Sequence, residues 1–473
     1  MHQSTRAELQ QLFETQKRAW AAHSYPSLEE RRDSLKRLRA ACAFARRGVA
    51  EALAADFGSH DPSFGLLWEL SGVLGRIRYT SEHLPRFMAP SPRDGDPFFP
   101  DGRCYVRYQP KGVVGNMAPW NFPVDISLGP LVDILAAGNR AIVKPSENAP
   151  HCAELVRQAI ASAFDPSEVA VVTGGLDMAQ AFAETPWDHL IYTGNAAVAR
   201  HVMAAAAKHL TPVTLELGGK SPAIIAPDRV TEETCAEILS IKAVKSGQVC
   251  INTDYVLAPR DRVASVIEHM QTLWARMFPR FVSDPNSVGI INARHYERLA
   301  GYVAEAKARG VRVIELGDEA PSAAARKLPL TLVIDPPDDL ALMREEIFGP
   351  ILPIKSYDAL DEAIAYVNEH ARPLALYVFT DDAATAERVI GLTTSGGACV
   401  NAVAVHAAVP SLPFGGIGES GMGAHHGIEG FRTFSHARAV FERGASNGWE
   451  LLRPPWGEPL AAIAAMAVDE PGT

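Results

Sequence analysis

Short β-rich runs alternate with helical stretches between residues 110 and 220. This alternation restricts the folds that the chain can adopt more than any other feature of the sequence. The runs GVVGNM, AIVKP, VAVVTGG and HLIYTG are separated by stretches such as DISLGPLVDILAAGN and APHCAELVRQAIASAF. Strands that alternate with helices of this length predict a parallel sheet with crossover helices on both faces. A second alternation begins with SPAIIA after residue 220 and continues to about residue 405. The sequence therefore predicts an α/β protein with two such units.

Composition and charge exclude several classes of protein. Hydrophobic residues make up 47% and charged residues 21% of the 473 residues, as in ordinary globular enzymes. The net charge of -10 argues against a nucleic-acid partner or an anionic membrane surface. The apolar run LAAIAAMAV is too short to span a bilayer, which needs about 20 residues. The polar first twenty residues and six scattered cysteines without a C-x-x-C pair predict a cytoplasmic protein.

Two of the cysteines are expected in the hydrophobic core. Cys42 lies on a face of apolar residues spaced three and four apart, from Leu35 to Val49. Cys235 precedes Ile238 and Leu239 in the same spacing, inside the run TEETCAEILSIKAVKSG, which is expected to be helical throughout. Neither cysteine is therefore a candidate for catalysis.

One glycine-rich motif is a weak match to a dinucleotide fingerprint. GGIGESG places glycines at Gly416, Gly418 and Gly421 in G-x-G-x-x-G spacing. That fingerprint requires a preceding strand, a following helix and a βαβ unit of about 30 residues, and PFGGIGESGMGAHHG continues as a loop. We expect this loop to line a site or an interface instead.

Three separated segments carry candidate chemistry: PWNFP with Asn121, TLELGGKSP with Glu216, and SGQVC with Cys250. Taken alone, the cysteine fits a buried structural residue, the glutamate an acceptor for a backbone donor, and the asparagine a turn former. In this order, and joined to EEIFGP and LPFGG, the segments resemble the aldehyde dehydrogenase superfamily from about residue 30 to 440. Within the superfamily, the chain is most similar to the class 3 and coniferyl aldehyde dehydrogenase branch. Three segments carry this similarity: IYTGN, LTPVTLELGGKSP and SLPFGGIGESGMGAHHGIEGFRTFSH.

The resemblance implies NAD(P)-dependent oxidation of an aldehyde to a carboxylic acid, and it assigns three catalytic residues. The Cys250 thiolate adds to the carbonyl carbon, because the electron-poor carbon must become tetrahedral before it can release hydride. The Asn121 amide and the Cys250 backbone N–H stabilise the oxyanion. Glu216 deprotonates the water that cleaves the thioester, and Glu346 is the competing candidate for this base.

The resemblance also places the coenzyme, which is expected to be NAD, with NADP as the alternative. Lys144 and Glu147 in KPSE approach the adenine-side ribose; the lysine tolerates the extra phosphate of NADP, whereas the glutamate repels it. The family usually has a second glycine where this chain has Ala199, and the added methyl group is expected to weaken coenzyme binding. The expected coenzyme-binding residues are Lys144, Glu147, Gly174, Gly194, Asn195, Leu217, Glu346, Phe348 and Trp120.

Three aromatic residues are expected to form the wall of a substrate tunnel near the nucleophile. They are Trp120 and Phe122, on either side of Asn121, and Phe414. The preferred substrate is an aromatic aldehyde such as coniferyl aldehyde, with medium-chain aliphatic aldehydes next. His425 and His426 are adjacent, and adjacent side chains on a regular element point apart, so we expect no metal site there.

The resemblance divides the chain into a Rossmann-like coenzyme domain, a second α/β catalytic domain and a small β arm. We expect the coenzyme domain at 1–82 and 107–214, the catalytic domain at 215–408, the bridging segments at 83–106 and 409–440, and a tail at 441–473. A homodimer or a dimer of dimers is expected to form through the arm. Two alternatives stay open: an acylating enzyme in which coenzyme A resolves the thioester, and a non-catalytic, crystallin-like protein.

Overall fold

The alternation between residues 110 and 220 folds into a parallel sheet, as the sequence predicts. The computed structural model describes residues 3–96 and 98–468. A short antiparallel strand from the C-terminal part of the chain adds to one edge of the sheet. In spatial order the strands are β15 (Gly421–Met422), β7 (Val213–Glu216), β6 (His189–Thr193), β3 (Val113–Met117), β4 (Arg140–Lys144) and β5 (Val169–Val171).

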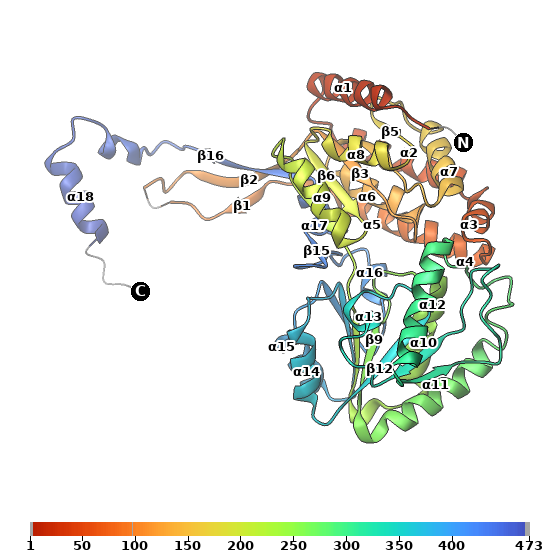
Figure 1. Cartoon of the computed structure of the whole chain (residues 1–473). Coiled ribbons are helices and arrows are strands. Elements are labelled where there is room, and N and C mark those ends of the chain that lie inside the picture. Colours follow the sequence, from red (N-terminus) through yellow and green to blue (C-terminus); the bar gives the residue numbers. More distant parts are fainter. Residues whose placement is uncertain (1–2, 97, 469–473) are drawn as a thin grey trace.

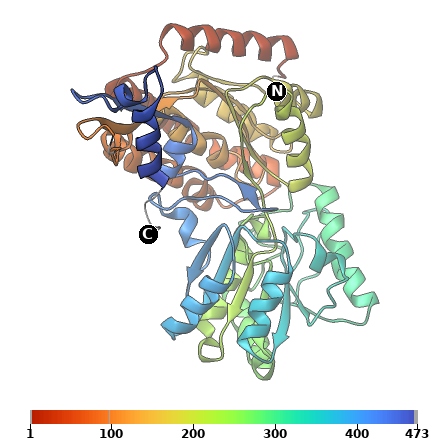
Figure 2. The ribbon, with the colours of Figure 1, turned by 90° about the vertical axis from the view of Figure 1, so that its left-hand side faces the viewer.

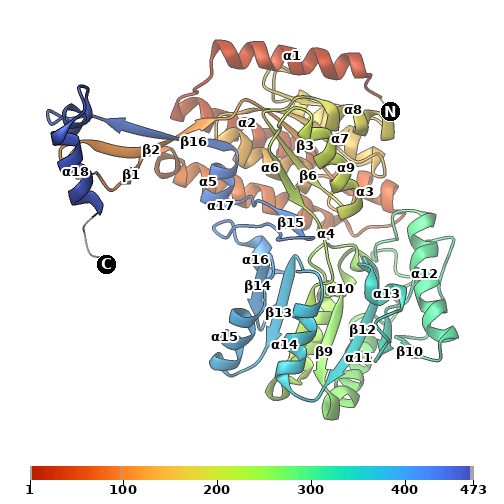
Figure 3. The same ribbon diagram turned by 60° about the vertical axis from the view of Figure 1, so that its left-hand side comes forward.

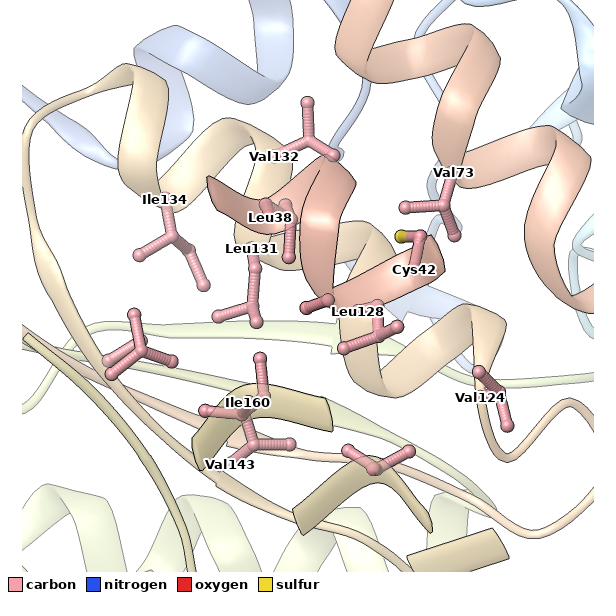
Figure 4. Close-up of a cluster of buried hydrophobic side chains, with 14 of the residues drawn as sticks. Leu38, Cys42, Val73, Val124, Leu128, Leu131, Val132, Ile134, Val143 and Ile160 are labelled. Atoms are coloured by element: carbon pink, nitrogen blue, oxygen red, sulfur yellow. The ribbon is translucent and has the colours of Figure 1, made fainter. Parts of the chain in front are cut away.

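Helices cover both faces of this sheet (Figure 1). Cys42 is 1% exposed and packs among Leu38, Val73 and Leu128 in the largest apolar cluster, which confirms it as a core residue (Figure 4). This face carries α2 (Leu28–Ala45), α3 (Val49–Phe57), α4 (Pro62–Leu66), the π-helical turn η1 (Leu67–Ser71), α5 (Gly72–Met88), α6 (Asp125–Ala136), α7 (Pro150–Ala161) and α17 (Gly427–Thr433). The other face carries α1 (Arg6–Ala22), α8 (Leu176–Glu184) and α9 (Ala196–Ala207).

A second, mostly parallel sheet forms the other body of the molecule, below the first in Figure 2. Its strands are, in spatial order, β10 (Arg312–Glu315), β11 (Thr331–Ile334), β12 (Ile351–Tyr357), β9 (Tyr255–Pro259), β8 (Pro222–Ile225), β13 (Ala375–Phe379) and β14 (Gly397–Val400). Cys235 is fully buried on one face, which confirms the second core cysteine. The surrounding helices are α10 (Glu232–Ala243), η2 (Pro227–Arg229), η3 (Val244–Gly247), η4 (Arg260–Arg262), α11 (Val263–Met277), α12 (Ala293–Ala308), α13 (Ala341–Arg344), α14 (Leu360–Glu369), α15 (Ala383–Leu392) and α16 (Val405–Ala408).

A narrow β arm projects from the first body (Figures 1 and 3). In the arm, β2 (Arg103–Pro110) pairs with β1 (Ser91–Arg93) on one side and with β16 (Ser435–Glu442) on the other. Two segments that are far apart in the sequence therefore form the arm. Beyond the arm lie η5 (Gly448–Leu452) and α18 (Glu458–Val468), whereas residues 469–473 of the expected tail are outside the described residues. Within the described ranges, no helix has the length and apolar character needed to cross a membrane.

Candidate active site

The residues singled out by the sequence gather at one edge of the first sheet. Asn121 follows β3, Lys144 ends β4, Gly194 follows β6 and Glu216 ends β7. These strands run parallel, so their carboxyl ends share one edge. Ligands of open α/β sheets bind outside the carboxyl ends of the strands. The chain then crosses from β7 into the second body, and this edge therefore faces the segment that carries Cys250.

Cys250 and Glu216 line the same cavity, which has a volume of about 410 Å³. Phe122 and Phe414 line it as well, where the sequence analysis expects the substrate. Asn121 contacts the segment that precedes Cys250, because its amide Nδ2 donates to the Gln248 carbonyl oxygen at 3.2 Å. An amide group has two N–H hydrogens, and this contact uses one of them. The fold thus brings the three expected catalytic residues together from three distant segments.

The Cys250 thiol holds its proton strongly in this cavity. Burial raises the pKa of Cys250 to about 12, and the nearby Glu346 and Glu216 carboxylates add to the increase. The backbone N–H groups of Cys250 and Ile251 act in the opposite direction and favour the thiolate. Because only the thiolate is a good nucleophile, the sulfur needs a neighbouring base to take its proton.

Two carboxylic groups near the sulfur can accept a proton. Glu216 is 1% exposed, and neither of its carboxylate oxygens has a hydrogen-bond partner among the described residues. Burial raises the pKa of Glu216 well above its usual range. Burial also raises the pKa of Glu346 to about 8, although a backbone hydrogen bond from Gly219 lowers it. A carboxyl group whose pKa lies nearer neutrality is suited to general acid–base catalysis.

The segment before Cys250 differs from the continuous helix expected over TEETCAEILSIKAVKSG. Helix α10 ends at Ala243, and Lys245, Ser246 and Gly247 adopt positive φ angles of 46°, 51° and 78°. A right-handed helix cannot continue through residues in the left-handed region. At Gly247 a Cβ atom would lie 2.3 Å from the Gly349 carbonyl oxygen, so a side chain does not fit there. This tight turn directs the chain, and Cys250 with it, into the cavity.

The expected coenzyme residues lie along the same edge. The Lys144 Nζ contacts the Glu147 carboxylate at 3.0 Å, and Glu147 and Gly174 line a pocket of about 140 Å³. Asn195 caps α9 by accepting from the Val198 backbone N–H. At Gly194 a Cβ atom would lie 2.2 Å from the Tyr192 hydroxyl oxygen, so a larger residue would require the Tyr192 side chain to move.

The two remaining features of this edge concern Ala199 and the aromatic residues. Ala199 is 2% exposed, and its methyl group packs in the apolar cluster between α9 and the sheet. Trp120 packs edge-on against Phe348 with ring centroids 5.3 Å apart, and it does not line the cavity of Cys250 in the described part of the chain. Trp120 thus packs beside another expected coenzyme-binding residue, and its place in the tunnel wall stays a prediction. Leu217, by contrast, lines that cavity, and Glu346 lies against Gly218.

Comparison with known proteins agrees with this geometry. The model of the aldehyde dehydrogenase family matches residues 1–440. The chain belongs to the aldehyde dehydrogenase family. It is 43% identical over 468 residues to a probable coniferyl aldehyde dehydrogenase of Caulobacter vibrioides, covering 97% of this chain and 96% of that protein. It is 40% identical over 463 residues to the coniferyl aldehyde dehydrogenase of a Pseudomonas species, with the same coverage.

Solved structures show the same fold. A substrate-bound structure of Staphylococcus aureus AldH, 31% identical, superposes with a TM-score of 0.90 over 97% of this chain and 99% of that one. A Mycobacterium tuberculosis aldehyde dehydrogenase complexed with NAD+, 27% identical, gives 0.83 over 93% and 91%. The chain is an NAD(P)-dependent aldehyde dehydrogenase. The donors at the sheet edge fit such a dinucleotide, because α9 begins just after β6 and Lys144 ends β4, so both present N–H groups at the carboxyl ends of parallel strands.

A buried ion pair that was not predicted from the sequence stabilises the segment that carries Asn121, the expected oxyanion donor of this aldehyde dehydrogenase. The Lys245 ammonium donates to the Glu69 carboxylate and, at 2.6 Å, to the Asn121 carbonyl oxygen. Glu69 also accepts from the backbone N–H groups of Val124 and Asp125, both at 2.9 Å. Glu69 and Lys245 are fully buried. Their only sequence signal is that charged residues interrupt apolar runs: Glu69 in GLLWELSGVLG, and Lys245 together with Lys242 in LSIKAVKSG.

Replacing Glu69 by Leu should destabilise the enzyme strongly. The substitution leaves the Lys245 ammonium buried without a counter-charge, which costs about 3–5 kcal/mol in comparable cases. Urea denaturation measures the free energy of unfolding. Asp361→Leu is the matched control, because its partner Arg388 is half exposed and an exposed ion pair contributes at most about 1 kcal/mol. Equal effects of the two substitutions would contradict a structural role for the buried pair.

The two adjacent histidines do not point apart, contrary to the expectation for a regular element. The rings of His425 and His426 lie with centroids 4.3 Å apart, and both residues line the cavity of Cys250. The reason is the backbone of His426, whose φ of 76° turns the chain as α17 begins. In the described part of the chain, no group of three or more His, Cys, Asp or Glu residues is placed to hold a metal ion.

Proposed function

We propose that this aldehyde dehydrogenase oxidises an aromatic aldehyde, such as coniferyl aldehyde, to its carboxylic acid through a thioester on Cys250. Medium-chain aliphatic aldehydes are the second candidates. The aromatic side chains of Trp68, Phe122 and Phe414 in the wall of the cavity support an aromatic substrate. The names of the relatives from Caulobacter vibrioides and Pseudomonas support the same class.

The first chemical step forms a bond between the Cys250 sulfur and the carbonyl carbon. Glu216 or Glu346 takes the thiol proton, and the sulfur adds to the carbon, which becomes tetrahedral. The Asn121 amide and the Cys250 backbone N–H donate to the resulting oxyanion. Bound NAD(P)+ supplies the hydride acceptor that converts this adduct to a thioester.

Water then resolves the thioester with the help of Glu216. The carboxylate removes a proton from water, the hydroxide adds to the acyl carbon, and the carbon–sulfur bond breaks. The sulfur recovers a proton and the carboxylic acid leaves. Because the Glu216 oxygens have no other partner among the described residues, they are available to orient that water.

The buried, unpartnered Glu216 carboxylate beside Cys250 is the observation that carries this proposal. It favours hydrolysis over transfer to coenzyme A, and the intact Cys250, Glu216 and Asn121 set favours an enzyme over a non-catalytic protein. The test incubates the enzyme with a panel of aldehydes and NAD or NADP, with and without coenzyme A. We expect the free acid in both cases; acyl-coenzyme A as the product, or no reduced coenzyme from any aldehyde, would contradict the proposal.

We also propose that NAD is preferred over NADP because Glu147 repels the additional phosphate. The buried Lys144 ammonium supports this preference. It already contacts the Glu147 carboxylate, which takes the place that a phosphate group would need beside this cation. A Glu147→Gln variant should raise the NADP-to-NAD ratio of kcat/KM about tenfold, which corresponds to about 1.4 kcal/mol. The control is Glu387→Gln on the exposed face of α15 in the other body. An unchanged ratio would remove Glu147 from coenzyme selection.

We further propose a cytoplasmic homodimer, or a dimer of dimers, that assembles through the arm. Exposed apolar side chains on and beyond the arm, at Phe98, Phe441 and Trp449, support an interface there. A dog relative, 36% identical over 438 residues, is named a dimeric, NADP-preferring aldehyde dehydrogenase. The six free cysteines fit the reducing cytoplasm.

A further inference from the structure

The mostly apolar wall of the cavity that contains Cys250 includes a polar cluster in addition to Glu216. We call Arg76, Asp125, His425 and His426 the polar corner; all four line the cavity. Arg76 contacts the His426 Nε2 through Nη1 at 2.6 Å and donates to the Asp125 carboxylate through Nη2 at 2.5 Å. None of these residues belongs to the catalytic set described above.

The contact with Arg76 fixes the tautomer of His426. A guanidinium group can only donate hydrogen bonds, so the His426 Nε2 must accept and the ring proton must lie on Nδ1. Burial lowers the pKa of His426 well below its usual range, and it lowers the pKa of His425 to about 3. Both rings are therefore neutral at physiological pH, and His426 presents a single Nδ1–H donor.

Three nitrogen atoms of the polar corner lack a hydrogen-bond partner in the described part of the chain. The His426 Nδ1, the His425 Nδ1 and the Arg76 Nε are buried without a partner among the described residues. Leaving a buried donor or acceptor unsatisfied is energetically unfavourable. The residues that carry these atoms line the cavity of Cys250, where the substrate is proposed to bind. A ligand with an oxygen atom at this position would satisfy them.

The backbone and the aromatic neighbours support a binding role. His426 has a φ of 76° and a ψ of 145°, a conformation that residues other than glycine rarely adopt. Strained residues of this kind cluster at functional sites, where the surrounding structure holds them in place. The His426 ring stacks on Phe414 at a centroid distance of 5.7 Å, and Trp68 packs near Phe122 at 6.2 Å. Flat side chains thus flank the space next to the polar corner.

We propose that the polar corner binds an oxygen substituent on the ring of an aromatic aldehyde and so selects phenolic substrates. A hydroxyl or methoxy oxygen accepts from the His426 Nδ1–H, and a hydroxyl hydrogen is donated to His425. The ring lies between Trp68, Phe122 and Phe414, and the aldehyde group reaches Cys250. This inference rests on the proposed function, because it needs an aldehyde to be oxidised in this cavity.

The first test compares two substrates of nearly equal size with the unmodified enzyme and NAD. para-Hydroxycinnamaldehyde carries the oxygen, and para-methylcinnamaldehyde replaces it by a methyl group. A site built to hydrogen-bond a hydroxyl group discriminates strongly against an analogue without it, whereas an apolar pocket does not. We expect kcat/KM for the hydroxyl compound to be higher by about tenfold or more. Equal values, or a preference for the methyl compound, would overturn the inference.

The second test assigns the selectivity to His426. In a His426→Leu variant the hydroxyl-to-methyl ratio of kcat/KM should fall to within about twofold of unity. His209→Leu is the control, because His209 is exposed beyond the end of α9. If His426→Leu keeps the ratio of the unmodified enzyme, the assignment is wrong. If His426→Leu does not fold, His425→Leu takes its place in the same comparison.

Failure of the inference and failure of the proposed function give different results. If the polar corner does not bind the oxygen substituent, both cinnamaldehydes yield reduced coenzyme at similar rates. If the proposed function is wrong, neither of them, nor unsubstituted cinnamaldehyde, yields any reduced coenzyme.

Discussion

A Cys250→Ser variant loses aldehyde-dependent NADH formation, with kcat/KM reduced by at least about 10,000-fold, as expected when a catalytic nucleophile is removed. The burial that raises the pKa of the Cys250 thiol to about 12 would oppose ionisation of a serine hydroxyl even more strongly. An alkoxide is therefore not formed, and the tetrahedral adduct does not accumulate. Absorbance of NADH measures the rate, and quenching of tryptophan fluorescence verifies that the coenzyme still binds.

Cys104→Ser is the matched control for this experiment. Cys104 is half-buried in β2 of the arm, where neither substrate nor coenzyme is expected. The control should retain the activity of the unmodified enzyme. Turnover by Cys250→Ser at the rate of the control would mean that another group attacks the aldehyde.

A Glu216→Gln variant should separate the two halves of the reaction. Cys250 can still form the thioester, so stopped-flow measurements should show a rapid burst of about one NADH per active site. Steady-state turnover then falls by at least about 100-fold, because the amide cannot deprotonate water. Glutamine keeps the size of the side chain, and it removes a buried carboxyl group whose oxygens have no partner among the described residues.

Glu346→Gln provides the discriminating comparison for this second experiment. Both carboxyl groups raise the pKa of Cys250, and the pKa of Glu346 itself is raised to about 8. If Glu216→Gln turns over normally while Glu346→Gln shows the burst and the stall, the role of the base belongs to Glu346.

The sequence allowed the two sheets to be predicted, because their signals are local. Strand and helix periods identified the elements, and the faces of Cys42 and Cys235 were evident from residue spacing alone. The segments around Asn121, Glu216 and Cys250 follow strand or helix ends, and parallel strands bring such ends to one edge. The roles of these three residues came from the family resemblance, because each residue taken alone fits a structural role.

The remaining features depend on contacts between distant residues or on unusual backbone angles. The ion pair of Glu69 and Lys245 joins residues 176 positions apart, and spacing in the sequence cannot reveal such a pair. The early end of α10 and the convergence of His425 and His426 both follow from positive φ angles at residues other than glycine. The direction of the Trp120 ring is not evident from the sequence either: it packs against Phe348, whereas the neighbouring Phe122 lines the cavity of Cys250.

The most direct test of the account is to trap the acyl group on the enzyme. The Glu216→Gln variant is mixed with NAD and coniferyl aldehyde, quenched in acid during the burst and digested for peptide mass spectrometry. The account predicts that the peptide containing Cys250 gains the mass of the acyl group and loses it on treatment with hydroxylamine, which cleaves thioesters. An unmodified Cys250 peptide after a full burst of NADH, or an acyl group on another residue, would contradict it.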